Sequence, residues 1–157
     1  RRSSDLPPVS TVNVSTRFLE PDPEITLTIP STSALAISAG AYDSAYRAYA
    51  DFSGRGYTRL TNQVKPDLAA PGVDITAPRA GGGYGSFTGT SFAAPFVTGA
   101  AALLMQWGIV LGNDPYLYGE KMKAYLRRGA GRLPGEPLWP NEKLGYGTLC
   151  VRDSLPL

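Results

Sequence analysis

A serine that could act as a nucleophile stands at the start of the longest apolar stretch of the chain. Ser91 lies within the sequence GTSFAAP at 89–95, and an apolar run at 96–105 follows without a break. The run predicts a helix that is buried on every side. The first turn of a helix offers unpaired backbone N–H groups and the positive end of the helix dipole. Negative charge that develops near Ser91 would be stabilised there, so the position favours nucleophilic chemistry.

A serine nucleophile needs a base, and the usual base is missing from this chain. The sequence contains no histidine, and an unassisted hydroxyl is barely ionised at neutral pH. A desolvated lysine can replace imidazole, so a dyad of Ser91 with Lys65 is one alternative. An N-cap serine without chemistry is another. We expect structural roles for Lys65 and for the nearby carboxylates of Asp51, Asp67 and Asp74.

Composition indicates one soluble domain without a cofactor. The chain has 157 residues, of which 43% are hydrophobic and 18% charged, with a net charge of +2. Basic residues form no block, which argues against nucleic acid or an anionic membrane as partner. Cys150 is the only cysteine, and no Cys/His cluster suggests a metal site. The apolar stretch from Phe92 to Met105 contains Pro95 and Gly99 and is too short to span a bilayer, so we expect a core helix.

Several short strands are expected before the Ser91 helix. Residues 25–29 alternate between apolar and polar types and predict a half-buried or edge strand. The unbroken apolar run at 34–39 predicts a central parallel strand. A further short strand is expected within 64–72, where it ends at a Pro-Gly turn, and residues 81–85 form a glycine-rich loop. These segments lead the chain to the helix that begins near Thr90.

A second, amphipathic helix is expected at 115–128, after an Asn113-Asp114 cap and before Gly129. Its apolar stripe contains Tyr118, Met122, Tyr125 and Leu126, and Lys121, Lys123 and Arg127 face outward. The tail from Gly131 on is rich in proline and glycine. We expect irregular structure there with one short strand near 146–151.

Three blocks, in the right order, resemble the C-terminal half of subtilisin-like serine proteases. GTSFAAP at 89–95 is similar to the family's nucleophile signature, and KPDLAAPGV at 65–73 resembles its KPDxxAPG strand. AISAGA at 36–41, with FSGRG at 52–56, resembles a core strand and the turn after it. The resemblance implies an α/β fold: the C-terminal half of the subtilisin-like fold, with a mostly parallel sheet, a buried nucleophile helix and a second surface helix.

Two further stretches resemble clostridial subtilases of the Csp germination-protease type and their gut relatives. They are RFLEPDPEIT at 17–26 and WPNEKLGYGTLC at 139–150. That subfamily carries a β-rich insertion before the core strand, so residues 1–24 would be a lead-in, the end of such an insertion. Residues 25–157 would then form the C-terminal portion of the catalytic domain. Family habit implies an extracytoplasmic or spore-associated bacterial protein.

The resemblance assigns site roles residue by residue. Ser91 matches the nucleophile, and its backbone N–H matches one oxyanion donor. The signature residues Gly89 and Thr90 stand beside it, and the Thr90 side chain would contribute secondarily to binding the oxyanion. Phe87, Thr88 and Gly89 match the strand that lines the leaving-group side of the substrate site. The family's catalytic Asp and His and its oxyanion Asn lie in an N-terminal half that has no counterpart in these 157 residues.

The resemblance therefore implies the nucleophile-bearing part of a serine endopeptidase, with polypeptide substrates and no cofactor or metal. On this hypothesis the isolated chain is inactive, and the N-terminal half of the same protease is its partner. The alternative is a non-catalytic subtilase-like fragment or pseudoprotease that binds a protein. Exposed strand edges would also allow homo-oligomers to form.

Overall fold

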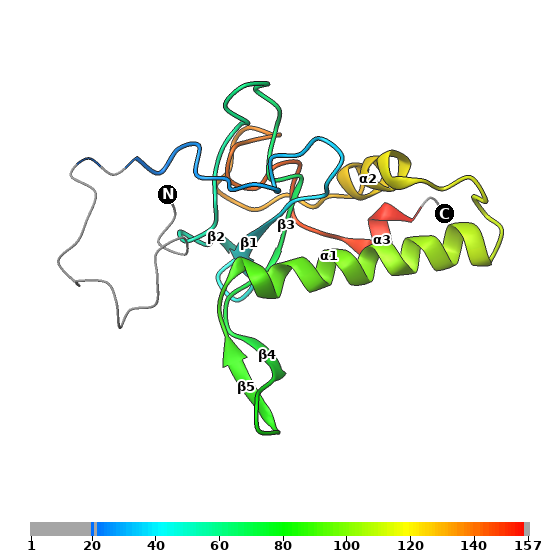
Figure 1. The fold of residues 1–157 in the computed structure, drawn as a ribbon, viewed down its shortest axis with the longest axis horizontal. Coiled ribbons are helices and arrows are strands. Elements are labelled where there is room, and N and C mark those ends of the chain that lie inside the picture. Colours follow the sequence, from blue (N-terminus) through cyan, green and yellow to red (C-terminus); the bar gives the residue numbers. More distant parts are fainter. Residues whose placement is uncertain (1–19, 21, 156–157) are drawn as a thin grey trace.

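The computed structural model describes residue 20 and residues 22–155, which form an α/β fold around one long helix (Figure 1). A three-stranded sheet has the order β2-β1-β3, with β1 (Ala39–Asp43) between β2 (Ala48–Tyr49) and β3 (Leu68–Pro71). β1 and β3 are parallel, with Ala39 opposite Leu68, whereas β1 and β2 are antiparallel. The expected lead-in at 1–24 lies almost entirely outside the described residues.

The predicted central strand exists, but it begins later than expected. β1 starts at Ala39, and of the residues before it 34–36 form bends and 37–38 are irregular rather than part of a strand. Side chains take the place of strand partners here: Lys65 Nζ donates to the Ala36 carbonyl at 2.7 Å, and Asp67 Oδ2 accepts from the Ser38 N–H at 2.8 Å. The strand expected within 64–72 is confirmed as β3.

The strand predicted at 25–29 is wrong. No strand forms there; Ile25 has a φ of 53°, in the left-handed region, and Ser31 N closes a turn on the Thr28 carbonyl. Ile29 is 89% exposed. The alternation of apolar and polar residues therefore does not reflect one buried face, which is the condition under which alternation indicates a strand.

The helix that carries Ser91 is confirmed, as α1 (Thr90–Met105), and continues as a π-helical segment, η3 (Gln106–Val110). Its buried residues, Ala93, Val97, Ala100 and Leu104, recur at helical spacing and form the main core with Leu68 and Ala70 of β3 and Met122 and Leu126. The expectation of burial on every side is wrong for this chain. Phe96, Leu103 and Met105 are 42%, 50% and 46% exposed, because the sheet covers only one side of α1.

Together α1 and η3 are also longer than the sequence suggested. Thr90–Val110 spans 21 residues with a mean hydropathy of 1.5, so length and composition alone would allow it to cross a bilayer. Core helices of soluble proteins pass the same test. In this fold α1 packs on β1 and β3.

A β-hairpin projects from the body beside the start of α1 (Figure 1). β4 (Ile75–Pro78) and β5 (Tyr84–Phe87) pair antiparallel, with Ile75 opposite Phe87. The expected glycine loop forms its tip, where Gly81, Gly82 and Gly83 all have positive φ and open space around them. β5 runs directly into Thr88, Gly89 and α1, so the hairpin delivers the chain to the Ser91 position.

The second helix is α2 (Gly119–Arg128), which begins four residues later than predicted but ends at Gly129 as expected. The capping role expected for Asp114 is wrong: its carboxylate accepts from Lys121 Nζ at 2.6 Å and from the Tyr125 hydroxyl at 2.9 Å. Lys123 does not face outward. Its side chain is 2% exposed, and its Nζ donates to the Ala34 carbonyl and to Glu120.

The tail pairs with the sheet without forming the short strand expected near 146–151. Ala69 N donates to the Gly147 carbonyl at 2.9 Å, and Leu149 N donates to the Ala69 carbonyl at 2.8 Å. A short helix, α3 (Val151–Ser154), follows. These two bonds occupy the outer side of β3 at Ala69. The proposed pairing of strand edges between copies of the chain stays a prediction.

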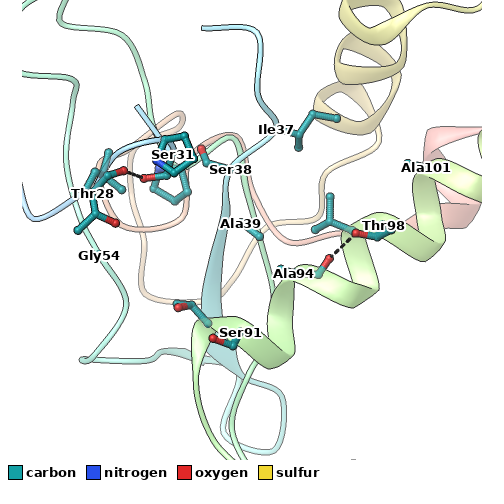
Figure 2. A pocket seen from close by; sticks show the side chains of 15 residues that line it. Thr28, Ser31, Ile37, Ser38, Ala39, Gly54, Ser91, Ala94, Thr98 and Ala101 are labelled. Carbon is teal, nitrogen blue, oxygen red and sulfur yellow. Dashed lines mark hydrogen bonds between the residues drawn. The ribbon is translucent and has the colours of Figure 1, made fainter. Parts of the chain in front are cut away.

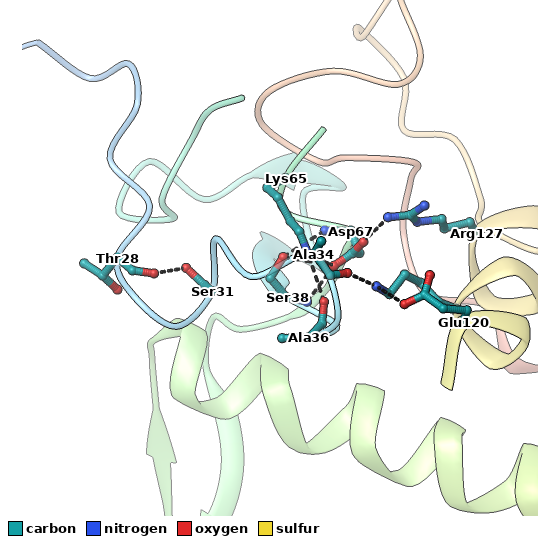
Figure 3. Close-up of polar contacts among 10 residues, drawn as sticks. Thr28, Ser31, Ala34, Ala36, Ser38, Lys65, Asp67, Glu120 and Arg127 are labelled. Carbon is teal, nitrogen blue, oxygen red and sulfur yellow. Dashed lines mark hydrogen bonds and ion pairs between the residues drawn. The ribbon is translucent and has the colours of Figure 1, made fainter. Parts of the chain in front are cut away.

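A buried ion cluster joins β3, α2 and the segment before β1 (Figure 3). Asp67 and Lys65 are 0% and 1% exposed, and Lys65 Nζ lies 2.7 Å from Asp67 Oδ2. Arg127 of α2 pairs with the other carboxylate oxygen, Oδ1. Burial opposes the ionisation of Asp67, but hydrogen bonds from Lys65, the Ser38 backbone and Arg127 outweigh it and lower the pKa of this carboxyl. The structural role expected for Asp67 and Lys65 agrees with these contacts.

Close backbone packing at Gly72 sets the distance between the sheet and α1. Gly89 N donates to the Gly72 carbonyl at 2.8 Å. A Cβ on Gly72 would lie 2.7 Å from the Ala41 Cβ and 3.1 Å from the Gly89 carbonyl oxygen. Only glycine fits between β1 and the entrance to α1.

Replacing Gly72 with alanine therefore tests this packing. We expect Gly72→Ala to lower the free energy of unfolding by about 1–3 kcal/mol, because Ala41 and Gly89 must move apart. Gly99→Ala is the control: no atom lies within 4 Å of its new Cβ, and alanine favours helix by about 1 kcal/mol. Urea unfolding measures both. Equal midpoints for the two variants would contradict the packing described.

The Asp67 cluster predicts acid sensitivity. A carboxyl whose folded pKa is lowered stabilises the fold above its unfolded pKa, near 3.8, and that contribution is lost as pH falls through the folded pKa. The stability difference between the parent chain and Asp67→Asn should therefore shrink as pH falls below 3.8. Urea unfolding across pH 2–7 measures it, with Asp51→Asn, at an exposed site, as the control. A difference that stays constant over this range would rule the contribution out.

Candidate active site

Ser91 occupies the second position of α1, with its side chain exposed to solvent. Gly89 is the N-cap, with a φ of 156° that side-chain-bearing residues rarely adopt, and no side chain caps the helix. The alternative of a simple N-cap serine is therefore wrong. No residue in the described part of the chain is recorded as a partner of the Ser91 hydroxyl. Its backbone N–H lies in the first turn, where N–H groups lack intrahelical acceptors.

A groove of about 620 Å³ opens beside Ser91 (Figure 2). One wall is the first three turns of α1, with Thr90, Ser91, Ala94, Val97, Thr98 and Ala101. The opposite wall comes from the segment before β1 and the start of that strand, including Thr28, Ser31, Ser38 and Ala39. None of the lining residues is charged.

The hydroxyl groups on the far wall are the part of this site that sequence reasoning missed. Ser31 donates to the Thr28 carbonyl, and Ser38 donates to Asp67 Oδ2 at 3.1 Å. Thr28 was predicted to lie in a strand at 25–29, no element was predicted at Ser31, and no motif marks either residue. Gly54 of FSGRG lines the same groove, but nothing in the sequence indicates that these two segments meet.

Phe87, Thr88 and Gly89 form the approach to Ser91, as their positions in the sequence suggested. The Phe87 ring stacks on Phe92 with centroids 5.1 Å apart. Thr88 Oγ1 accepts from the Asp74 N–H at 3.0 Å, and Ser86 donates to the Asp74 carboxylate at 3.2 Å. These contacts fix the end of β5 and hold the Phe87–Gly89 segment at the helix entrance.

Lys65 is not arranged as a base for Ser91. Its ammonium group is buried against Asp67 and the Ala36 carbonyl, and Lys65 is not among the groove-lining residues. Within the described residues, no group of three or more His, Cys, Asp or Glu side chains could hold a metal ion. The site as it stands offers a hydroxyl, a helix N-terminus and a neutral groove, which suit an acyl-transfer nucleophile but supply no general base.

Comparisons with known proteins agree with the fold and the motifs. The subtilase family model matches residues 9–147. The minor extracellular protease Vpr of Bacillus subtilis is 46% identical over an alignment of 115 residues, which covers 68% of this chain and 13% of Vpr. Serine protease AprX of the same organism is 31% identical over 151 residues, covering 83% of this chain and 32% of AprX.

Solved structures show the same relationship. The CspB protease of Clostridium perfringens superposes with a TM-score of 0.85 at 46% identity, over 91% of this chain and 30% of that chain. The prenylagaramide maturation protease PagA gives a TM-score of 0.68 at 29% identity, over 85% of this chain and 46% of PagA. The likeness to Csp-type proteins is thus confirmed. The chain spans less than a third of Vpr, AprX and CspB.

The family match covers most of the chain, and the signature around Ser91 lies at the entrance of the helix that carries it. Vpr, AprX and CspB are all proteases by name. The chain belongs to the subtilase family of serine proteases.

Proposed function

We propose that this chain is the nucleophile-bearing part of a subtilisin-like serine endopeptidase and that Ser91 is its nucleophile. The observation that carries the proposal is the state of Ser91: exposed, without a hydrogen-bond partner among the described residues, and placed in the first turn of α1 beside an open groove. A serine that only stabilised the helix would be expected to accept a hydrogen bond from a backbone N–H of the first turn with its hydroxyl oxygen.

In the proposed reaction, Ser91 Oγ attacks the carbonyl carbon of a peptide bond. A histidine removes the serine proton and returns it to the leaving amine, while an aspartate orients that histidine. The Ser91 backbone N–H, at the positive end of α1, donates to the oxyanion that forms, together with an asparagine side chain. Thr90 stands next to this donor. Phe87, Thr88 and Gly89 bind the leaving-group side of the polypeptide along the end of β5.

The histidine, the aspartate and the asparagine are proposed to come from an N-terminal portion of the same protease. No histidine occurs in the 157 residues. The apolar face of α1 that the sheet leaves uncovered, with Phe96 and Leu103 seven residues apart, supports such a partner because burial of this surface would be favourable.

The location and the substrates follow from the family. Polypeptides are the substrates of proteases, and the name of Vpr describes an extracellular protease. We therefore place this protein outside the cytoplasm.

A second candidate function is a pseudoprotease that binds a protein partner through the same face of α1. One observation favours it, the absence of histidine from the chain.

Reconstitution tests the enzymatic proposal. The chain is mixed with the N-terminal portion encoded upstream, and cleavage of a quenched fluorescent peptide library is followed. In subtilisin, loss of the serine or the histidine lowers kcat by about 2 × 10⁶. We therefore expect activity from the mixture and background from the chain alone.

Serine variants sharpen this test. Ser91→Ala should abolish cleavage by the mixture, whereas Ser44→Ala, at an exposed serine in the turn between β1 and β2, should retain it. Cleavage by the chain alone, or undiminished cleavage by the Ser91→Ala mixture, would refute the proposal. A mixture that binds but never cleaves would favour the pseudoprotease.

The face of α1 gives a separate prediction. Leu103→Glu should change the stability of the chain itself by less than about 0.5 kcal/mol, because Leu103 is 50% exposed. It should weaken binding of the N-terminal portion by at least about 2 kcal/mol, since a carboxylate would be buried without a partner. Calorimetric titration measures the Kd, with Leu60→Glu, 95% exposed and far from α1 in the sequence, as the control. Equal Kd values for the two variants would exclude this face as the contact.

A further inference from the structure

The buried carboxylate of Asp67 contacts Ser38 (Figure 3), which lines the groove beside Ser91. Its Oδ2 accepts from the Ser38 N–H at 2.8 Å and from the Ser38 hydroxyl at 3.1 Å. Lys65 Nζ, which pairs with the same oxygen at 2.7 Å, also holds the Ala36 carbonyl at 2.7 Å. Ser38 lines the groove opposite α1. The orientation of this carboxylate therefore sets the N–H and the hydroxyl of Ser38, whereas the Ser38 carbonyl is held separately by the Asp67 N–H at 2.9 Å.

The other carboxylate oxygen is held from α2. Arg127 Nη2 donates to Asp67 Oδ1, and among the described residues no other partner of Oδ1 is recorded. The guanidinium lies over the Tyr146 ring, 4.4 Å from its centroid, and the side chain is 29% exposed. A planar group that is stacked on one face and paired at one edge has little freedom to move. Arg127 thus sets the angle at which Asp67 meets Ser38.

Loss of Arg127 would leave a buried, charged oxygen without its partner. Such an oxygen costs the full desolvation penalty, so the carboxylate would rotate Oδ1 toward one remaining donor, Lys65, and Oδ2 would lose its alignment with the other donor, the Ser38 N–H. Lys65 and Ser38 both belong to the contacts that hold the segment at 36–38. The rotation would loosen the Ser38 N–H and move the Ser38 hydroxyl in the groove wall, while the hydrophobic core between α1 and the sheet would stay in place.

We propose that Arg127, acting through Asp67, is a positioning residue for the Ser91 site: it sets the groove wall at Ser38 against which the substrate is held. This inference rests on the proposed protease function. Neither residue touches the reacting atoms, so the effect falls on substrate binding rather than on the chemical step. The alternative is that the pair contributes to stability alone.

Two adjacent arginines provide a matched test. Arg128, like Arg127, lies in the last turn of α2 and over a tyrosine ring, with its guanidinium carbon 5.4 Å from the Tyr125 centroid. No ion pair of Arg128 is recorded among the described residues. Arg127→Gln and Arg128→Gln each remove one charge and one stacking contact, but only the first removes the partner of Asp67. Arg127→Lys keeps the charge and serves as the conservative variant.

The first measurement uses the chain by itself. Hydrogen exchange and the chemical shift of the Ser38 amide, followed by NMR, report its bond to Asp67. We expect Arg127→Gln to shift this resonance and to speed its exchange about tenfold or more relative to Arg128→Gln, since a bond to a charged group weakens. Arg127→Lys should restore part of the protection. A Ser38 amide that behaves alike in both glutamine variants would overturn the inference.

The second measurement uses the chain reconstituted with its N-terminal portion. We expect Arg127→Gln to raise KM for a peptide substrate about tenfold and to leave kcat within twofold, while Arg128→Gln matches the parent in both. A role in stability alone would lower the active fraction, and hence the apparent kcat, without a change in KM. Equal KM values for the two variants would refute this inference alone. A parent mixture without activity would refute the proposed function, and this inference with it.

Discussion

The whole arrangement depends on the close approach of Gly72 and Gly89. The bond from Gly89 N to the Gly72 carbonyl joins the end of β3 to the entrance of α1, and any side chain at Gly72 would force the two apart. Because of this contact, α1 starts directly above the sheet and presents Ser91 in its first turn. The small residues Ala93, Val97 and Ala100 then follow the sheet closely. The position of Ser91 therefore depends on a backbone contact that only glycine allows.

A second constraint acts from the opposite side of the groove. The carboxylate of Asp67 is fully buried and is satisfied by three elements that are distant in sequence: Ser38 before β1, Lys65 before β3 and Arg127 on α2. Removing one partner of a buried ion pair is strongly destabilising, because it leaves an uncompensated buried charge. Asp67 therefore holds one wall of the groove while α1 provides the other. Together the two constraints define a neutral cleft beside the exposed Ser91 hydroxyl.

Motifs within a short stretch of sequence predicted the elements whose formation depends on that stretch alone. GTSFAAP indicated the helix entrance and the position of Ser91, and KPDLAAPG indicated β3, because glycine, proline and apolar runs act on their own backbone. The inward turn of Lys123 was not predictable, since its partner, the Ala34 carbonyl, lies 89 residues away. The alternation at 25–29 misled because no element covers one face of that segment. The exposure of Phe96 and Leu103 depends on which surfaces meet α1, and a hydrophobic profile does not contain that information.

The central claim is that Ser91 becomes a nucleophile only when other residues supply its base. Labelling with a serine-reactive fluorophosphonate, followed by peptide mass spectrometry, tests this most directly because it reports the activated hydroxyl itself. With the N-terminal portion present, the account predicts one modified residue, Ser91, and it predicts no modification of the chain alone over the same time. Equal labelling of Ser91 with and without that portion, or labelling of a different serine in the complex, would contradict it.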